Sequence, residues 1–452
     1  MTVTSPDVIV IGAGFAGLSA AVRLATRGAR VLVLEARSRL GGRATAFADR
    51  ETGEIVDNGQ HILMGCYTET FAFLRDIGAQ DHVRLDPQLA VTMIDRAGRR
   101  TRLSCPALPP PLHLVAGVLE WEALTWRDRV SMLAMATPLK NARRELAGAT
   151  LKAASPDETV ENWLIRNGQT PRLRELLWDP LALAALNQPP HLAAAPPFAR
   201  VLAEMFGDDP RAAAIALPTR PLDLMYAEPA RAYIDAHGGQ VRTGATATIM
   251  LSAGGEAIAG VRIGAETIEA AQVISSVPWF ALAELFDTDP VPLRGVLERA
   301  RRMASSPIVT VNLWFDRRVL DLPFVGLPGR AMQWVFDVAH IRGEDASGGH
   351  LSLVSSGAAD ILAETNVELV HRAHAELLDA LPDVRAAKLR HATVVREPRA
   401  TCSLAPGQPP RPSTETGLKG FLLAGDWIDT GLPATIESAV RSGHRAAACC
   451  IW

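Results

Sequence analysis

The feature that most constrains the fold is a glycine-rich turn between an apolar run and a helical pattern near the start of the chain. Asp7–Ile11 has the composition of a buried parallel strand, Gly12–Gly17 supplies the turn, and Gly17–Thr26 has the pattern of a helix. Arg30–Leu34 predicts a second strand, followed by Glu35. Strand, helix and strand form one Rossmann-type βαβ unit, so the sequence predicts an α/β fold with a parallel sheet.

Three glycines at a G-x-G-x-x-G spacing predict that this turn binds a dinucleotide. Gly12 permits the tight turn, Gly14 lets a pyrophosphate approach the backbone, and Gly17 lets the helix pack closely on the strand. The start of the helix, with the N–H groups of Phe15 and Ala16, offers donors and partial positive charge to phosphates. A glycine-rich turn without a ligand is the alternative, and the flanking strand and helix argue against it.

The next motif favours FAD over NAD. Glu35 stands at the predicted strand end, where a carboxylate accepts hydrogen bonds from ribose hydroxyls. The segment Glu35–Arg43 continues with a glycine pair that permits close backbone approach and with arginines that can neutralise pyrophosphate oxygens. A NAD site has no need of this extension, so we predict FAD as the cofactor. The predicted FAD contacts here are Glu35, Ala36, Arg37, Gly41, Gly42 and Arg43.

A third motif lies near the C-terminus. Gly420–Ala424 has the pattern of an apolar strand, Gly425-Asp426-Trp427 follows it, and a helix is predicted from about Ala434 to Ala448. Free N–H groups at the start of that helix can stabilise negative charge on the pyrimidine of a reduced flavin. Asp426 can bind the ribityl or phosphate region. The predicted FAD contacts here are Gly425, Asp426, Ala434, Thr435 and Ile436.

The fourth motif, Asp57-Asn58-Gly59-Gln60-His61, gathers polar residues around a glycine at a predicted strand end. We expect Gly59 to lie beneath the flavin ring. His61 is the predicted catalytic proton donor, because an imidazole titrates near neutral pH and Asp57 can orient it. Asp57 itself and Glu437 are the alternative acids. A hydrogen-bonded loop with a structural histidine is the competing interpretation.

Strand-rich and helix-rich stretches alternate along the chain and predict two interleaved domains. A second strand-rich block is expected at Gly238–Val241, Thr246–Leu251, Ala259–Ile263 and Gln272–Ser275. The FAD-binding domain is assigned to 1–75, 221–290 and 413–452. A mixed α+β substrate domain is assigned to 76–220 and 291–412, where helical patterns, tryptophan and proline are more frequent.

The composition argues against several function classes. A net charge of −3 gives no basis for nucleic-acid binding, and none of the five cysteines forms a C-x-x-C pair, so we predict no metal site. Sparse cysteines suit a reducing compartment, and we expect a cytoplasmic protein without a signal peptide. No apolar run is clean enough to span a bilayer. The proline-rich Cys105–Pro111 with Leu112–Trp121, and the apolar Leu176–Leu186, can line a tunnel, contact a membrane surface such as that of the inner membrane, or form ordinary core.

Taken in order, the four motifs resemble those of FAD-dependent amine oxidases and carotenoid desaturases over nearly the whole chain. Within that superfamily the chain is similar to the hydroxysqualene dehydroxylases of bacterial hopanoid biosynthesis. The segments that carry this closer resemblance are Asp57–His61 with Gly65 and Tyr67, Cys105–His113, Pro180–Asn187, Gly425–Trp427 and Leu432–Ala439.

The resemblance implies a two-domain flavoprotein that reductively removes an allylic hydroxyl from a long-chain C30 isoprenoid alcohol, giving squalene. It also implies a backbone contact between adenine and the strand that aligns with Thr246. A carotenoid or phytoene-type desaturase or isomerase is the alternative enzyme. A non-redox carrier of prenylated partners shares this fold, but the intact glycine motif and Glu35 favour bound flavin.

The chain departs from the amine oxidases in two places. Gly431–Ala434, before the C-terminal helix, has no aromatic ring, and no lysine lies between Lys152 and Lys388. A primary amine is therefore not the expected substrate. The chain also contains a single G-x-G-x-x-G, so we expect electrons to come from a separate reductase or from a small donor that reaches the flavin directly.

Overall fold

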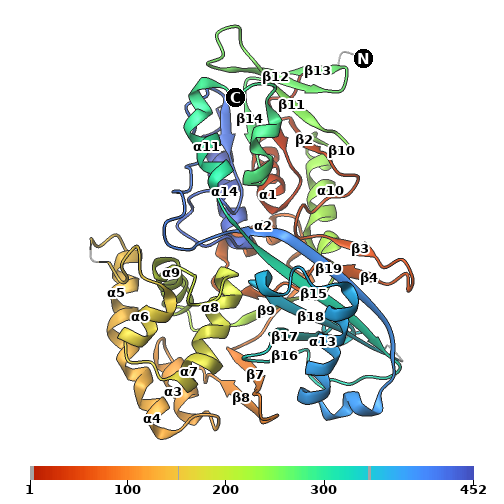
Figure 1. Ribbon diagram of the computed structural model, residues 1–452. Coiled ribbons are helices and arrows are strands. Elements are labelled where there is room, and N and C mark those ends of the chain that lie inside the picture. The colour runs from red at the N-terminus through yellow and green to blue at the C-terminus, as the bar shows by residue number, and fades with distance from the viewer. Residues whose placement is uncertain (1–4, 151, 345–347, 452) are drawn as a thin grey trace.

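A parallel five-stranded sheet forms the upper part of the molecule in Figure 1. The computed structural model describes residues 5–150, 152–344 and 348–451. The strand order is β10-β2-β1-β14-β20. The bounds are β1 Val8–Ile11, β2 Val31–Glu35, β10 Gln240–Thr243, β14 Val273–Ser275 and β20 Phe421–Leu423. All residues of β1, β2, β14 and β20 are buried, which is the pattern expected for strands covered on both faces.

The two faces of this sheet pack against different partners. On one face Val8, Val10 and Val33 meet helices of a shared apolar core. Those helices are α1 Phe15–Thr26, α2 Thr68–Asp76, α10 Glu228–Ala236 and α14 Ile436–Cys449. On the other face Ile9 and Ile11 meet an antiparallel three-stranded sheet and α11 Arg294–Arg302. The strands of that sheet are β11 Ala247–Leu251, β12 Ile258–Ile263 and β13 Glu266–Glu269.

A mixed, mostly antiparallel seven-stranded sheet lies below, in the order β19-β15-β18-β17-β16-β7-β8. Its bounds are β7 Ala90–Ile94, β8 Arg100–Ser104, β15 Ser305–Phe315, β16 Phe324–Gly326, β17 Trp334–Asp337, β18 Gly349–Ser356 and β19 Leu389–Cys402. Side chains alternate along β15, so Val309, Val311 and Leu313 pack with α13 Asn366–Ala380 on one face. Thr310 and Asn312 therefore point to the opposite face, and Gly59 lies against Thr310 on that face.

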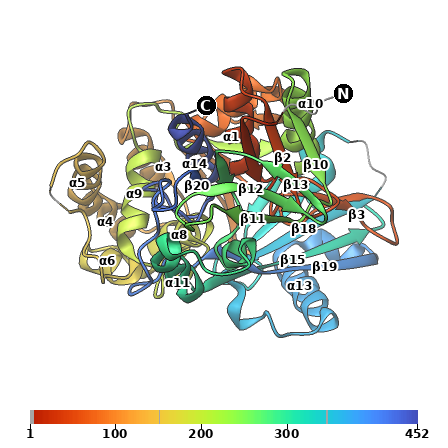
Figure 2. The same ribbon diagram turned by 90° about the horizontal axis from the view of Figure 1, so that it is seen from above.

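Helices from the first half of the chain stand beside both sheets, and α4, α5 and α6 lie at one side of the molecule when it is seen from above (Figure 2). Their bounds are α3 Leu112–Glu120, α4 Trp126–Ser131, η2 Met132–Met135, α5 Ala136–Leu146, α6 Val160–Arg166, α7 Pro171–Leu173, η3 Arg174–Trp178, α8 Asp179–Leu186 and α9 Ala195–Met205. Thr125 starts α4 with a reciprocal capping box to Asp128, and Asn187 ends α8 in the left-handed conformation.

Short elements connect these layers. The hairpin β3 Ala46–Ala48 and β4 Ile55–Asp57 leads into the Asp57–His61 loop, and β5 Leu63–Met64 pairs with β9 Ile215–Pro218. The remaining elements are β6 Val83–Leu85, α12 Val338–Arg342, the π-helix η4 Asp223–Ala227 and the 3-10 segments η1 Gln80–His82, η5 Trp279–Leu285, η6 Val291–Leu293, η7 Ala358–Asp360 and η8 Pro382–Ala386. Among the described residues, no helix has both the length and the apolar character needed to cross a bilayer.

The α/β fold predicted from the sequence is confirmed, and the strands predicted at both ends of the chain begin within two residues of the expected positions. The stretch 291–412, expected to be richer in helical patterns, forms strands β15–β19 as well as helices α11, α12 and α13. Val309, Val311 and Leu313 alternate with Thr310 and Asn312, which is a strand pattern that the sequence-based prediction did not use. The division into two interleaved domains stays a prediction.

Candidate functional site

Of the three glycines in the β1–α1 loop and the first turn of α1, the packing of the protein requires Gly12 and Gly17 but not Gly14. Gly12 has φ +104°, and a Cβ there would lie 2.6 Å from Ser276 Oγ. A Cβ on Gly17 would lie 2.0 Å from the carbonyl oxygen of Gly12. Gly14 has an extended backbone with φ −89°, and the protein atoms nearest to a Cβ there would be 3.8 Å away. Close approach of a ligand to the backbone is the explanation that fits Gly14.

The N-terminus of α1 opens at this loop without a side-chain cap and without an acidic residue in its first turn. First-turn N–H groups have no acceptor within the helix, so the amides of Phe15 and Ala16 are suited to an anion such as a pyrophosphate. Both residues are buried on the side-chain side, with the Phe15 ring stacked on Tyr226 at 3.5 Å between centroids. The residues present therefore fit the phosphate groups of a dinucleotide.

The second glycine loop, Gly41–Arg43, lies against the first. Gly41 donates its N–H to the carbonyl of Ala13 at 2.8 Å, and a Cβ on Gly42 would lie 3.3 Å from Gly14 Cα. The buried Tyr226 hydroxyl is 2.8 Å from the carbonyl oxygen of Gly41 and 3.0 Å from that of Ala44. Tyr226 thus holds both glycine loops, through its ring and its hydroxyl, and sequence reasoning did not identify it because it lies far away along the chain.

Glu35 ends β2, as predicted, and its carboxylate accepts N–H groups of Ala13 and Arg37, each at 2.9 Å. Ala36 and Arg37 follow on an exposed turn. The segment before Thr246 joins this turn, because Ala245 donates its N–H to the Glu35 carbonyl at 2.9 Å. The structure therefore brings together Glu35 and the Thr246 segment, the two parts predicted to hold the ribose and adenine of FAD.

Arg43 and Asp426, both predicted to contact FAD, form an ion pair with each other. Arg43 also donates to the carbonyl of Ala400 at 2.6 Å and lies over the Trp279 ring at 5.7 Å from its centroid. The pair joins the second glycine loop to the C-terminal loop. Arg37, the other arginine proposed for the pyrophosphate, is exposed, with Nη1 3.4 Å from the carbonyl oxygen of Gly42.

The C-terminal helix α14 begins at Ile436, two residues after the predicted start at Ala434. Thr435 is its N-cap and accepts the N–H of Ser438 at 3.2 Å. The first N–H groups of a helix need acceptors from outside it, and this cap supplies one. Gly425, at the end of the preceding strand, donates its N–H to Ser442 of α14 at 2.7 Å. This contact fixes the middle of α14 against the carboxyl edge of the parallel sheet.

Glu437 is buried in the first turn of α14, and its carboxylate accepts hydrogen bonds from the first turn of α2. Its carboxylate accepts the N–H groups of Glu69 at 3.1 Å and Thr70 at 2.9 Å, and the Thr70 hydroxyl at 2.8 Å. Burial raises the pKa of Glu437. Because these bonds satisfy the first turn of α2, we rank Glu437 last among the candidate acids.

Asp57 is buried at the end of β4 and is tied to three neighbours. It accepts the N–H of Leu222 at 2.9 Å and the side-chain amide of Gln60 at 3.0 Å, and it forms an ion pair with Arg342 at 3.4 Å. Burial raises the pKa of Asp57, and the positive charge of Arg342 opposes that rise. The carboxylate therefore anchors the loop to two other parts of the chain.

His61 is oriented by a backbone carbonyl, so the expectation that Asp57 orients its ring is corrected. Nδ1 lies 2.7 Å from the carbonyl oxygen of Gly59. A carbonyl oxygen can only accept, so Nδ1 carries the hydrogen and Nε2 has its lone pair free in the neutral ring. Burial lowers the pKa of His61, while the nearby charge of Asp57 acts in the opposite direction.

Gly59 lies directly on the seven-stranded sheet, since a Cβ there would be 3.3 Å from Thr310 Oγ1. Thr310 Oγ1, Asn312 Nδ2 and Ser352 Oγ are buried and make no hydrogen bond with the described residues. Asn312 stands opposite Ser352 in the pairing of β15 with β18. Sequence reasoning missed this group, and the available signal was two polar residues at alternate positions in an apolar strand.

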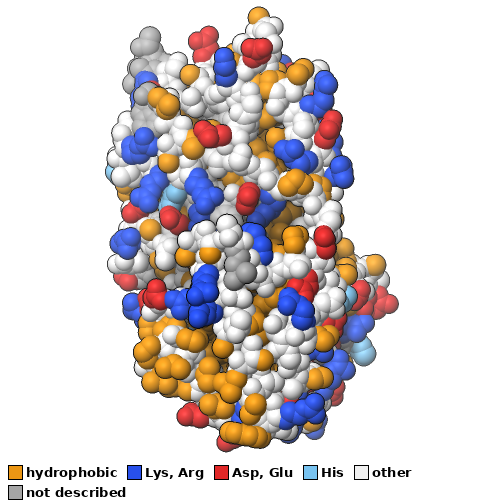
Figure 3. Space-filling view, turned by 90° about the vertical axis from the view of Figure 1, so that its left-hand side faces the viewer, with side chains coloured by type: hydrophobic (Ala, Val, Ile, Leu, Met, Phe, Trp, Pro, Cys, Tyr) orange, Lys and Arg blue, Asp and Glu red, His pale blue; other side chains and the backbone are white. Residues whose placement is uncertain are grey.

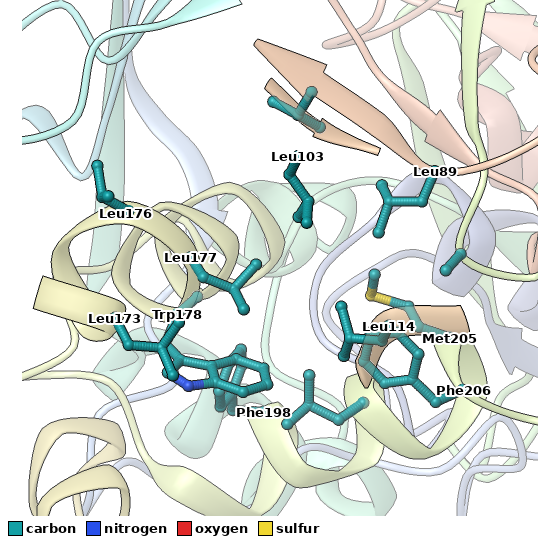
Figure 4. Close-up of a cluster of buried hydrophobic side chains, with 14 of the residues drawn as sticks. Leu89, Leu103, Leu114, Leu173, Leu176, Leu177, Trp178, Phe198, Met205 and Phe206 are labelled. Atoms are coloured by element: carbon teal, nitrogen blue, oxygen red, sulfur yellow. The ribbon is translucent and has the colours of Figure 1, made fainter. Parts of the chain in front are cut away.

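A large apolar cluster begins next to His61, because Ile62 and Met64 pack against its edge. Figure 4 shows Leu89 and Leu103 of the sheet side facing Leu177, Leu114 and Met205 of the helices. His113 lies at this cluster, 2% exposed, with both ring nitrogens lacking partners among the described residues and its ring 5.8 Å from that of Phe206. Burial lowers the pKa of His113. The sequence marked Cys105–His113 only through resemblance.

No group of three or more histidine, cysteine, aspartate or glutamate side chains in the described ranges is arranged to hold a metal ion. The arrangement is a helix N-terminus and two glycine loops beside a buried polar loop and an apolar cluster. It offers backbone donors to the phosphates of a dinucleotide, with an apolar cluster close to the polar loop.

Curated relatives are similar to the chain over almost its full length. The hydroxysqualene dehydroxylase of Zymomonas mobilis is 28% identical over 97% of both chains, and that of Rhodopseudomonas palustris is 29% identical over 98% of both. The 15-cis-phytoene desaturase of Capsicum annuum is 27% identical over 98% of this chain and 77% of its own.

Solved structures share the fold. An oxidoreductase from Methanosarcina mazei superposes with a TM-score of 0.75 at 17% identity, over 97% of this chain and 99% of its own. Cyclohexylamine oxidase from Brevibacterium oxydans superposes with a TM-score of 0.71 at 18% identity, over 98% of each chain. A family model described as flavin containing amine oxidoreductase matches residues 15–451. The chain therefore belongs to the flavin-containing amine oxidoreductase family, and its cofactor is FAD.

Proposed function

We propose that the protein is a hydroxysqualene dehydroxylase, which removes the allylic hydroxyl of a C30 isoprenoid alcohol and yields squalene for hopanoid biosynthesis. The observation that carries the proposal is the apolar cluster that begins one residue after His61, because a long hydrocarbon needs an apolar site beside its reacting carbon. The dehydroxylase relatives are matched over nearly all of their own length, whereas the phytoene desaturases are matched over 77–78% of theirs.

The reaction balances as alcohol plus one proton plus one hydride, giving hydrocarbon plus water. Bound reduced FAD supplies the hydride. The protein has to deliver the proton to the hydroxyl oxygen, let the resulting water leave, and keep other water from the carbon that lost it. Leu89, Leu103 and Leu177 provide apolar walls for this purpose.

His61 is the proposed proton donor. Its Nδ1 hydrogen is held by the Gly59 carbonyl, so the protonated ring would donate from Nε2. Because burial lowers the pKa of His61, its protonated ring is a stronger acid, but a smaller fraction of the protein carries it at neutral pH. We therefore expect faster turnover on the acidic side of neutrality. Asp57 is the second candidate, since burial raises its pKa.

The proposed FAD contacts are the residues predicted from the sequence motifs, together with Thr246, which the resemblance implies. They are Gly12, Gly14, Phe15, Ala16, Gly17, Glu35, Ala36, Arg37, Gly41, Gly42, Arg43, Gly59, Thr246, Gly425, Asp426, Ala434, Thr435 and Ile436. We also propose a separate electron donor, because the sequence carries a single dinucleotide motif.

The test is anaerobic incubation of the photoreduced holoprotein with hydroxysqualene, with the product identified by mass. We expect squalene and one reoxidised flavin per squalene formed. Phytoene, supplied to the oxidised protein with a quinone acceptor, serves as the comparison substrate. Desaturated phytoene without any squalene would replace the proposal with the desaturase alternative. Purified protein without bound FAD that turns over neither substrate would favour a carrier of prenylated partners.

A further inference from the structure

The outer surface of the helical group carries a patch of exposed large apolar side chains. Leu108 and Leu112 stand at the start of α3, and Trp126, Val130 and Leu133 follow on α4 and η2, which pack against α3. Their exposed fractions run from 40% for Leu108 to 70% for Trp126. Figure 3 shows hydrophobic side chains gathered over the lower end of this face. We call these five residues the α3–α4 patch.

The patch is held rigidly. The capping box between Thr125 and Asp128 starts α4, and Asp128 also accepts the Thr170 hydroxyl at 2.7 Å. Gln169 donates to the carbonyl of Ser131 at 2.8 Å. The exposed Trp126 and Val130 side chains therefore project from an ordered helix with buried anchors, and their exposure is a property of the folded state.

Basic side chains continue the exposed helical face that carries the α4 and η2 residues of the patch. Trp126, Val130 and Leu133 recur at intervals of four and three residues along α4 and η2, and Lys140 and Arg144 extend this spacing along α5. Lys140, Arg144 and the neighbouring Arg127 are exposed, and none of them has an ion-pair partner within the described part of the chain. Aromatic and aliphatic side chains beside unpaired cations are typical of proteins that insert into the headgroup region of a bilayer.

We propose that the α3–α4 patch docks the protein onto an anionic phospholipid bilayer. Leu108, Leu112, Trp126, Val130 and Leu133 enter the boundary between headgroups and acyl chains, while Arg127, Lys140 and Arg144 meet the phosphates. A second copy of the chain is the competing occupant. A two-fold dimer places the same surface on both subunits, so it would bring these unpaired cations towards one another, and the charge pattern favours the bilayer.

The position of the patch links it to the apolar cluster beneath. Leu114 and Val118 on the inner face of α3 belong to that cluster, and Leu112 of the patch is exposed on the same helix. The docking surface goes beyond the proposed reaction and does not depend on the identity of the substrate.

The experiment is co-sedimentation of the FAD-loaded full chain with vesicles. We expect binding to vesicles of phosphatidylcholine with 30–40% phosphatidylglycerol (roughly the anionic content at which a few basic residues add measurable attraction), and binding that weakens as salt is raised. Trp126→Glu with Leu133→Glu should lower the bound fraction at least about tenfold. Lys140→Gln with Arg144→Gln should remove most of the preference for phosphatidylglycerol over pure phosphatidylcholine.

The matched control places two glutamates at exposed apolar positions elsewhere, Val291→Glu with Val367→Glu, which are 73% and 79% exposed. This control should bind vesicles like the parent chain. FAD content and thermal midpoint, measured for every variant, separate lost docking from lost folding. The proposal is overturned if the parent chain stays in the supernatant, if the patch variant binds as well as the control, or if the parent is a dimer in light scattering that the patch variant converts to a monomer.

Discussion

The parallel sheet and the seven-stranded sheet bring polar groups to the site in different ways. At the carboxyl edge of the parallel sheet the groups come mainly from backbone, in the turns around Gly12–Gly17 and Gly41–Arg43, and the acidic side chains there have protein partners. On the seven-stranded sheet the groups are side chains. Thr310, Asn312 and Ser352 each keep a buried polar atom without a partner among the described residues.

The two regions therefore differ in which part is rigid and which part can recognise a ligand. The conformation of the two glycine turns is fixed by contacts within the protein. Their shape is therefore set by the fold before the cofactor binds. Buried polar atoms without partners cost free energy in the folded chain, and such groups in a native protein call for a functional reason. We therefore expect changes at the first region to act on cofactor binding or folding, and changes at the second to act on substrate recognition.

The largest effect on the purified protein should come from substitutions in the first glycine loop. There the cofactor requires a glycine at position 14, whereas packing of the fold requires one at position 17. Gly14→Val should yield folded protein without FAD, because the added side chain occupies the position expected for the pyrophosphate and meets no protein atom closer than 3.8 Å at Cβ. Gly17→Val should yield no soluble folded protein, since its Cβ would lie 2.0 Å from a backbone oxygen.

Absorbance at 450 nm with the purified yield of each variant measures this contrast. Gly28→Val is the control, because Gly28 lies outside the loop and no atom stands within 4 Å of its Cβ position, although its φ of +88° gives that variant backbone strain. A Gly14→Val protein with full FAD occupancy would show that the cofactor lies elsewhere.

The success of sequence reasoning differed between these regions for a physical reason. The dinucleotide motif is contiguous, so Gly12–Gly17 and Glu35 could be assigned from spacing alone, and the elements around them begin within two residues of prediction. Thr310, Asn312 and Ser352 come together only through the pairing of β15 with β18, and nothing local to the sequence marks that pairing. His61 likewise hydrogen-bonds the Gly59 carbonyl and not Asp57, and this choice of partner depends on the backbone conformation of a short loop.

His61 stands in the loop that contacts the seven-stranded sheet, and its replacement tests whether this loop acts in the reaction. His61→Ala should keep its FAD and its flavin spectrum while squalene formation falls by about 10²-fold or more, the usual scale for general acid catalysis. The control is His237→Ala, which removes an exposed histidine whose Nδ1 is likewise 2.8 Å from a carbonyl oxygen. If His61→Ala turns over at the parent rate between about pH 6 and 8, His61 is structural.

A smaller effect should appear in the dependence of stability on pH. Burial lowers the pKa of His350 to about 3, with Arg342 acting in the same direction. Below about pH 6.5 His350 therefore becomes protonated in the unfolded chain while it stays neutral in the folded chain. Stability should be fully present above pH 6.5 and fall as the pH drops towards 3, by at most about 1.4 kcal/mol per pH unit for this group.

His350→Gln should make that acid-side decline shallower in urea unfolding curves recorded between pH 7 and 5. His371→Gln on α13 is the exposed control and should leave the slope of the parent chain unchanged. Equal slopes for the parent and His350→Gln would mean that protonated His350 is accommodated in the folded chain, through its neighbour Glu54 at 3.6 Å.

The smallest effect separates the two regions with a pair of buried threonines. Thr45, beside the second glycine loop, donates its hydroxyl to the carbonyl of Leu40 at 2.9 Å, whereas the Thr310 hydroxyl on the seven-stranded sheet makes no hydrogen bond with the described residues. Both side chains are at most 1% exposed. Thr45→Val should lower the free energy of unfolding by about 1 kcal/mol, because the variant loses a hydrogen bond and leaves the carbonyl with one partner fewer. Thr310→Val should leave the free energy of unfolding unchanged or raise it by up to about 1 kcal/mol, since an unpaired hydroxyl is replaced by a methyl group of similar size.

If Thr310 recognises the hydroxyl of the substrate, the same variant should also raise KM without loss of stability. Loss of about 1 kcal/mol in both variants would show that the Thr310 hydroxyl is as well hydrogen-bonded as that of Thr45, and that the two regions do not differ in unpaired polar groups.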